Sequence, residues 1–248
     1  MSLTGKVFII TGGSKGIGKA VVKKVVAEGA RVVINYNSDK QAAYELVTEL
    51  GGADKAVAIQ ADASKISEVE KIVSTAVERF GKIDVVMPNA GMMSMIDLEH
   101  VTEANFDKIF ELNVKGPLFL VQKSVPHMPR GGRVIFVSTG VTTLTSIMPP
   151  YLLYAATKAA IEQFTRVLAK DLGKTKGINV NCVAPGPVGT DLFYEGKSQQ
   201  LLDMIGNQSP FGRVGTPEEI AGVVAFLSGD ESSWVSGQVW RVNGGNMV

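Results

Sequence analysis

The sequence predicts an α/β fold: one domain, residues 1–248, with a doubly wound, seven-stranded parallel sheet covered by helices on both faces. Short β-branched runs alternate with longer segments of helical period along the chain. That alternation is typical of parallel strands joined by right-handed helical crossovers. With 248 residues, 45% of them hydrophobic, the chain can bury a sizeable core and still form a single domain.

The expected elements follow in chain order. Strands are expected at "KVFIIT", "RVVINY", "AVAIQAD", "IDVVM", "GGRVIFVS", "INVNCVAP" and "QVWRVN", and helices at "AVVKKVVAEG", "QAAYELVTEL", "EVEKIVSTAVERFG", about 102–123, about 151–172 and "TPEEIAGVVAFL". Gly29, Gly81 and Gly173 are expected to end helices, because glycine adopts positive φ at little cost. Thr216 is the expected N-cap of the last helix.

Charge and composition favour a small-molecule partner. Lys and Arg number 25 against 24 Asp and Glu, a net charge of +1, so no strong field favours nucleic acid or an anionic membrane. No run of eighteen apolar residues and no signal peptide is present, and we expect a cytoplasmic protein. The only cysteine, Cys182, excludes an intrachain disulfide; a buried strand position is favoured over a reactive thiol. His100 and His127 are far apart, so no metal site is predicted.

A glycine-rich loop, "TGGSKGIG" at 11–18, follows the first strand and begins the first helix. The N-terminus of a helix offers free N–H groups and a positive dipole end to an anion. Glycines at positions 12, 16 and 18 let the backbone approach a pyrophosphate closely. The loop is therefore a candidate dinucleotide site, although such turns also occur for packing reasons and the spacing is not G-x-G-x-x-G.

The end of the second strand bears on which dinucleotide binds. An acidic residue about 20 positions after the loop grips the ribose 2′-hydroxyl of NAD. Tyr36, Asn37 and Ser38 stand there instead, and Lys15 in the loop offers a positive charge to a 2′-phosphate. NADP is favoured and NAD remains possible. Asp39 is the one nearby acid that could bind the ribose of NAD. An acid at a helix start is, however, more often an N-cap than a ribose ligand.

Of the two tyrosines in "YLLYAATKAA", Tyr154 is the candidate proton donor. Residues four apart share one helix face, so Lys158 lies beside Tyr154, whereas Tyr151 has only Ala155 at that offset. A nearby ammonium favours phenolate and is expected to lower the pKa of Tyr154. Ser138 ends a strand, at the edge where an open α/β sheet binds its ligand.

With these motifs in this order, the chain resembles the short-chain dehydrogenase/reductase family over its full length. The resemblance implies a Rossmann fold and a catalytic set of Asn113, Ser138, Tyr154 and Lys158. In that family the serine binds the carbonyl oxygen, the tyrosine protonates it, the lysine grips the nicotinamide ribose and the asparagine orders a water. The cofactor residues are Gly12, Ser14, Lys15, Gly16, Ile17, Gly18, Tyr36, Asn37, Ser38, Asp62, Ala63, Asn89, Ala90, Gly91, Tyr154, Lys158, Pro185, Gly186, Val188 and Thr190.

The chain departs from the family pattern in two places. Pro88 precedes Asn89 where the family commonly has asparagine. Sixteen residues separate Ser138 from Tyr154, a few more than is usual, and Tyr151 occupies the commoner offset of thirteen. The lysine partner still favours Tyr154, and the extra residues are expected to lengthen the loop before it.

The substrate side is expected to be apolar. The segment 188–213 has no clear period, which is typical of a lid or binding loop that orders when ligands bind. Met92 and its neighbouring methionines could fill the core or edge a pocket. Tyr151 could form a pocket wall or pack on the surface. The substrate-pocket candidates are Met92, Tyr151, Leu192, Phe193 and Met204.

The function predicted is an NADP-dependent ketoreductase that interconverts a ketone and a secondary alcohol, of polyketide, naphthol or 3-oxoacyl type. An NAD-dependent sugar, polyol or alcohol dehydrogenase is the alternative. A non-catalytic nicotinamide-binding regulator is the third and most remote alternative, because a protein that only senses the cofactor has no use for a proton donor. The family resemblance also implies a homo-oligomer, a tetramer or dimer, built on the helices at 102–123 and 151–172.

Overall fold

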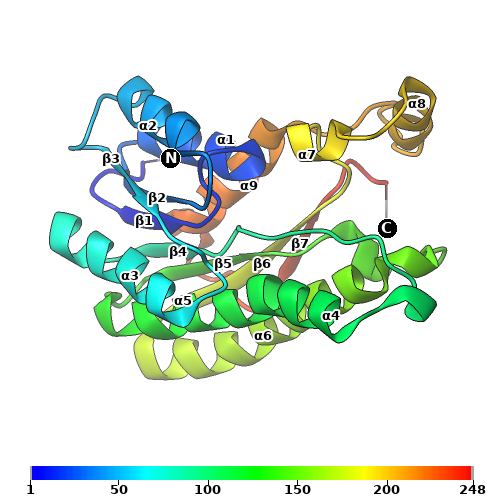
Figure 1. The fold of residues 1–248 in the computed structure, drawn as a ribbon. Coiled ribbons are helices and arrows are strands. Elements are labelled where there is room, and N and C mark those ends of the chain that lie inside the picture. Colours follow the sequence, from blue (N-terminus) through cyan, green and yellow to red (C-terminus); the bar gives the residue numbers. More distant parts are fainter. Residues whose placement is uncertain (1, 247–248) are drawn as a thin grey trace.

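The computed structural model describes residues 2–246, except for the side chain of Leu192. Its centre is one seven-stranded, wholly parallel sheet in the order β3-β2-β1-β4-β5-β6-β7 (Figure 1). The strands are β1 Val7–Ile10, β2 Arg31–Tyr36, β3 Ala56–Gln60, β4 Val85–Met87, β5 Arg133–Val137, β6 Asn179–Pro185 and β7 Val239–Val242. All seven predicted strands are confirmed. The strand order reverses between β1 and β4, the position where open α/β sheets bind ligands.

Helices cover both faces of the sheet (Figure 1). One layer contains α1 Gly16–Ala27, α2 Lys40–Glu49 and α9 Pro217–Ser228. The other contains α3 Ile66–Phe80, α4 Glu103–Phe110, α5 Gly116–Ser124 and α6 Leu152–Lys176. Alternate strand residues face opposite layers: Phe8 and Ile10 pack with α1 and α9, whereas Ile9 packs with α3 and α6. The sheet is therefore buried on both faces, which explains its nearly continuous apolar strands.

Two helix boundaries differ from the prediction. The prediction that Gly173 ends α6 is wrong: α6 continues to Lys176, and Gly177, at φ 67°, ends it. The N–H of buried Ile178 bonds to the carbonyl of Leu172 at 3.2 Å, a Schellman arrangement that needs an apolar residue after the glycine. Gly173 lacks that following residue, because Lys174 comes next.

The predicted helix at 102–123 is interrupted by a turn of π-helix. Residues Glu111–Lys115 form this turn between α4 and α5. Pro117 has no N–H to offer the carbonyl four residues earlier, that of Asn113, so the regular hydrogen-bond ladder cannot pass through this point. The turn buries the Asn113 side chain, which is 1% exposed, against the interior.

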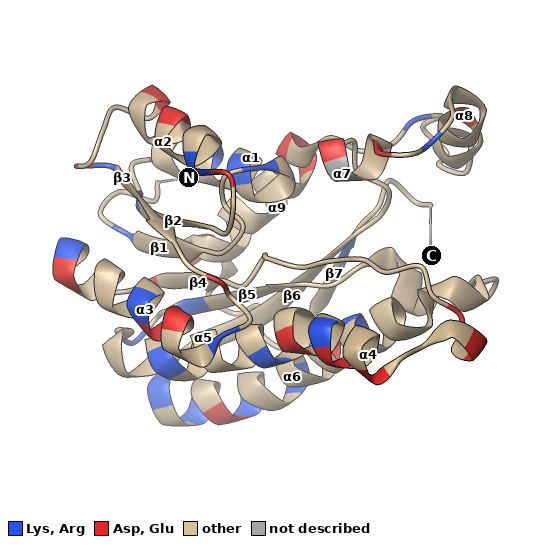
Figure 2. Ribbon diagram, in the orientation of Figure 1, with Lys and Arg blue, Asp and Glu red and all other residues tan. Residues whose placement is uncertain are grey.

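The predicted loop 188–213 contains two short helices, α7 Asp191–Tyr194 and α8 Gln199–Asn207. They lie beyond the sheet, with α8 farthest out (Figure 1). Charges of both signs are spread over the outer helices, and the visible strands are almost free of them (Figure 2). Among residues 2–246, no helix combines the length and hydrophobicity needed to cross a bilayer.

Candidate active site

The glycine loop lies between the end of β1 and the start of α1, as predicted. Gly12 and Gly16 have φ of 61° and 51°, a region that other residues rarely adopt. A Cβ on Gly18 would lie 2.3 Å from the Gly12 carbonyl oxygen. No side chain caps the start of α1, and its first turn has no acidic residue, so its N–H groups are free for an anion. Ser14 is buried, and Ile17 packs partly into the core.

Residues after β4 fasten the glycine loop to the centre of the sheet. The Thr11 hydroxyl accepts hydrogen bonds from the N–H groups of Asn89 at 2.9 Å and Ala90 at 3.0 Å. The Asn89 amide donates to the carbonyls of Thr11 at 2.9 Å and Gly12 at 3.2 Å. The Asn89 side chain, expected to belong to the cofactor site, thus also shapes the loop itself. Pro88 removes none of these donors.

Buried Asn35 is a further brace that the sequence analysis missed. Its amide donates to the Ala61 carbonyl at 2.8 Å, its side-chain oxygen accepts from the Gly12 N–H at 3.4 Å, and its own carbonyl accepts from the Gly13 N–H at 2.9 Å. A polar residue within the apolar strand "VVINY" was the available signal, because buried amides need partners.

At the end of β2, Tyr36 is buried while Asn37 and Ser38 are exposed. Asp39 caps α2 by accepting from the Ala42 N–H at 3.0 Å, so the N-cap interpretation is confirmed. The same carboxylate also pairs with Lys15, at 2.6 Å. This contact lowers the pKa of Asp39 and raises that of Lys15. The cation predicted to meet a 2′-phosphate thus already has a half-buried anionic partner.

The other cofactor candidates surround the same edge. Asp62 accepts hydrogen bonds from the backbone and hydroxyl of Ser64 at 2.9 and 2.7 Å. The carbonyl of buried Ala63 would lie 2.1 Å from a Cβ on Gly116, so α5 begins in close contact with this strand end. Pro185 ends β6, and the Gly186 N–H donates to the Val242 carbonyl at 3.1 Å.

Past β6, the chain turns back toward the glycine loop. Val188 bridges to Gly215 in parallel fashion, and Thr190 caps α7. The Thr190 methyl group lies 3.2 Å from where a Cβ on Gly16 would be. The structure therefore brings the 188–190 motif against the glycine loop, although the two are about 170 residues apart in the sequence.

Tyr154 and Lys158 are neighbours on α6, as their spacing predicts. The Lys158 ammonium lies 5.9 Å from the centre of the Tyr154 ring and donates to the Val137 carbonyl at 2.9 Å. Burial lowers the pKa of Lys158 to about 8. Burial also raises the pKa of Tyr154, and the Thr139 hydroxyl partly offsets that rise. The expected lowering by Lys158 is therefore wrong for this structure, because desolvation of the phenolate prevails.

Ser138, which the family resemblance places in the catalytic set, directs its hydroxyl to an acidic residue. Ser138 is 3% exposed, and its hydroxyl donates at 2.8 Å to Glu162, two turns beyond Tyr154 on α6. The next residue, Thr139, is the one whose hydroxyl acts on the Tyr154 phenol and opposes the rise of its pKa. Successive residues of an extended chain point in opposite directions, so only one of the two can face Tyr154. The sequence "VST" contains both hydroxyl residues, and it does not show which of the two faces Tyr154.

Asn113 reaches the site from the π-helical turn. Its side chain exchanges two hydrogen bonds with the backbone of Met92, at 2.9 and 2.8 Å, and donates to Thr157 at 3.1 Å. A Cβ on Gly91 would lie 3.2 Å from the Asn113 oxygen and 3.6 Å from the Lys158 ammonium. Because Gly91 has no side chain, its backbone can lie close to both groups.

The substrate-pocket candidates are only partly brought together. Tyr151 lies beside Tyr154, with ring centres 6.3 Å apart, and the Ile96 N–H donates to the Pro150 carbonyl at 2.9 Å, which joins the methionine segment to the loop before α6. Met92 and Phe193 are half-buried, while Met204 is 55% exposed on α8. The side chain of Leu192 lies outside the described residues. Cys182 is wholly buried and its pKa is raised to about 12, as expected for a strand residue.

Comparison with known proteins agrees with this geometry. A family model described as Enoyl-(Acyl carrier protein) reductase matches residues 12–246. The hydroxynaphthalene reductase-like protein Arp2 of Metarhizium robertsii is 39% identical over 260 residues, covering 100% of this chain and 97% of the relative. The chain belongs to the short-chain dehydrogenase/reductase family. An uncharacterised oxidoreductase of Methylorubrum extorquens is 41% identical over 249 residues, 98% of each chain.

Solved members of the short-chain dehydrogenase/reductase family share the whole fold. A short-chain dehydrogenase/reductase from Serratia marcescens superposes with a TM-score of 0.94 at 32% identity, covering 100% of both chains. A blue fluorescent protein from a metagenomic library, solved in complex with NADPH, gives 0.93 at 35% identity, also over 100% of both chains. The family establishes this chain as an oxidoreductase acting on CH–OH and C=O groups.

Proposed function

We propose that the protein is an NADP(H)-dependent oxidoreductase that interconverts a ketone and a secondary alcohol, with Tyr154 as general acid and base. One observation carries this proposal: a phenol that lies one helical turn from a buried amine, Lys158, beside a hydroxyl, that of Thr139, which favours its charged form. A purely structural tyrosine does not need either partner, and a proton donor at the ligand-binding edge of the sheet suits carbonyl reduction.

The chain's own groups divide the work. A bound nicotinamide supplies the hydride for reduction and accepts it for oxidation. Tyr154 gives its phenolic proton to the carbonyl oxygen as negative charge develops there, and Thr139 donates a hydrogen bond to the same oxygen. Lys158 holds positive charge beneath Tyr154, which favours the phenolate left after proton transfer. Thr139 thus takes the role that the family resemblance had given to Ser138.

The residues present fit a nicotinamide dinucleotide. The start of α1, which no side chain caps, can receive the pyrophosphate. Gly91 has no side chain that would stand between the cofactor and Asn113 or Lys158. NADP is the favoured form, because Lys15 is the cation at the exposed end of β2 and a 2′-phosphate could compete with Asp39 for it. Two similar structures are described as complexes with NADPH and NADP, which supports this preference.

The proposed substrate is apolar and cyclic, such as an alicyclic or aromatic ketone. Exposed apolar side chains lie on the segments around the site: Met93, Met95, Ile147, Met148, Tyr194 and Met204 are each at least 38% exposed. Apolar groups left uncovered at a functional edge favour an apolar ligand. The relatives named hydroxynaphthalene reductase-like support the same substrate class.

Nicotinamide absorbance, followed with a panel of ketones and alcohols and both cofactors, tests the proposal. We expect apolar cyclic ketones and NADPH to give the highest kcat/KM. Tyr154→Phe should lower kcat roughly 10²- to 10⁴-fold, the usual contribution of a placed acid, and Thr139→Val should lower it less. Turnover that survives Tyr154→Phe would contradict the assignment of the acid. Preference for polyols and NADH would favour a sugar or polyol dehydrogenase instead.

We also propose a homo-oligomer built on α4, α5 and α6. Phe106 on α4 is 44% exposed and Val167 on α6 is 56% exposed, which is unusual for side chains of this size on helices with charged neighbours. A native mass of one chain in light scattering would contradict this proposal.

A further inference from the structure

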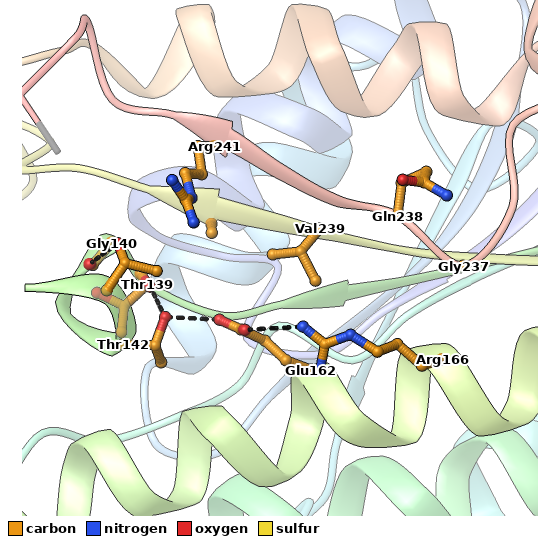
Figure 3. A pocket seen from close by; sticks show the side chains of 11 residues that line it. Thr139, Gly140, Thr142, Glu162, Arg166, Gly237, Gln238, Val239 and Arg241 are labelled. Atoms are coloured by element: carbon orange, nitrogen blue, oxygen red, sulfur yellow. Dashed lines mark hydrogen bonds and ion pairs between the residues drawn. The ribbon is translucent and has the colours of Figure 1, made fainter. Parts of the chain in front are cut away.

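Glu162 is a buried acid that the proposed reaction does not use. It lies on α6, one turn beyond Lys158, and is 8% exposed. Its Oε1 atom accepts hydrogen bonds from Ser138 at 2.8 Å and from Thr142 at 2.6 Å. Its other oxygen is 3.7 Å from Arg166, which is largely exposed (Figure 3). A buried carboxylate is costly unless it is paired and hydrogen-bonded, and this one has both kinds of partner.

The two hydroxyls that Glu162 holds flank the residue that faces Tyr154. Ser138 directly precedes Thr139, and Thr142 follows it within the 3₁₀ turn Gly140–Thr143. One carboxylate oxygen therefore fixes the chain on both sides of Thr139. Hydrogen bonds to a charged acceptor are about twice as strong as neutral ones, so this single atom is an effective anchor.

Part of this turn borders open space. Behind it lies a cavity of about 290 Å³, bordered by Thr139, Gly140, Thr142, Glu162 and Arg166 on one side and by β7 residues such as Arg241 on the other (Figure 3). A segment that borders open space lacks the close contacts that fix side chains in a core. On the side of α6, the turn is tied by the hydrogen bonds that Glu162 accepts from Ser138 and Thr142.

We propose that Glu162 is a positioning residue that sets the Thr139 hydroxyl against Tyr154 through Ser138 and Thr142. This inference rests on the proposed function, in which Thr139 binds the substrate oxygen. It assigns Ser138 to the support of the neighbouring hydroxyl. A small displacement of a group that contacts the reacting atoms lowers the rate of the chemical step far more than it weakens ligand binding.

Glu162→Leu is the first test, with Thr165→Val as the matched control. Thr165 is a buried residue on the same helix, and its hydroxyl donates to the Ile161 carbonyl at 2.9 Å. We expect Glu162→Leu to lower kcat roughly ten- to a hundredfold, with the NADPH dissociation constant within about twofold. Glu162→Gln keeps an oxygen acceptor and should restore kcat to within a few-fold of wild type. Thr165→Val should match wild type.

Hydrogen exchange supplies a readout that is independent of turnover. Amides of residues 140–144 should exchange faster in Glu162→Leu and at the wild-type rate in Thr165→Val. Adding Ser138→Ala to Glu162→Leu should cost nothing further, because the bond it removes is already lost. Equal kcat and equal exchange in folded Glu162→Leu and wild type would overturn the inference.

Two outcomes separate this inference from the proposed function. Should wild type turn over no ketone or alcohol, the proposed function fails, and exchange still reports whether Glu162 holds the turn. Should Glu162→Leu not fold, Thr142→Val decides, because the carboxylate keeps Ser138 as a partner. A several-fold fall in kcat with faster exchange at 140–144 supports the inference, and wild-type values for both overturn it.

Discussion

The glycine loop and the segments around the substrate are held by different means. The loop at 11–18 depends on backbone contacts so close that a Cβ on Gly18 would collide with the Gly12 carbonyl. The turn after β5 depends on side chains, and α8 leaves Met204 more than half exposed. The difference indicates that the cofactor end tolerates almost no change, whereas the substrate end can vary its side chains while the fold persists.

Gly18→Ala, compared with Gly222→Ala, should have the largest effect and tests whether the glycine loop tolerates an added side chain. A methyl at position 18 would lie 2.3 Å from a backbone oxygen, whereas one at position 222, on α9, meets nothing within 4 Å. We expect at least a hundredfold loss of NADPH affinity for Gly18→Ala, measured by fluorescence titration, because the loop must open. Gly222→Ala should keep the affinity and gain up to about 1 kcal/mol of stability. Similar affinities for both variants would refute the rigid-loop account.

Lys158→Met probes the point where the two regions meet. Burial lowers the pKa of Lys158 to about 8 from 10.5, so between these values the unfolded chain binds more protons than the folded one. The free energy of unfolding should therefore rise as pH increases from 8 to 10.5, and charged Lys158 should cost stability below pH 8.

The variant should lose turnover yet be more stable than wild type at pH 7, by up to about 3 kcal/mol. The gain should shrink toward pH 10.5. Urea unfolding of both proteins at pH 7 and pH 10 checks this. A variant less stable at pH 7 would mean that the hydrogen bond to Val137 outweighs the cost of burying the charge.

Lys15→Ala sharpens the comparison within the cofactor end. Its side chain is 60% exposed and its ammonium is paired with Asp39, so its contact with a 2′-phosphate is screened by water. We expect NADPH to bind about tenfold more weakly and NADH almost unchanged. Lys23→Ala is the control, because Lys23 lies on the same helix and pairs with Glu49. An equal loss for NADPH and NADH would remove the argument for NADP.

Met204→Ala should have the smallest effect. Its side chain is already 55% exposed, so truncation removes little buried apolar area. A substrate KM a few-fold higher, with the NADPH dissociation constant unchanged, is expected in steady-state kinetics. No change with any apolar ketone would place Met204 outside the substrate pocket.

The amino-acid sequence by itself determined the fold class, the seven strands and the Tyr154–Lys158 pair. Strand and helix periods, and an offset of four on one helix, are local properties that depend on backbone geometry alone. The glycine loop was equally readable, because only glycine tolerates its φ angles and close contacts.

Only the tertiary structure decided which hydroxyl faces Tyr154. Ser138 and Thr139 are adjacent and chemically alike, and the choice between them depends on which one the chain after β5 turns toward Tyr154 and which toward Glu162, two turns farther along α6. The tertiary structure also decided that Tyr154 has a raised pKa, since desolvation depends on everything packed around a group and not on its nearest charge. Side-chain direction at a strand end and burial are both properties of the assembled layers, and no local pattern contains them.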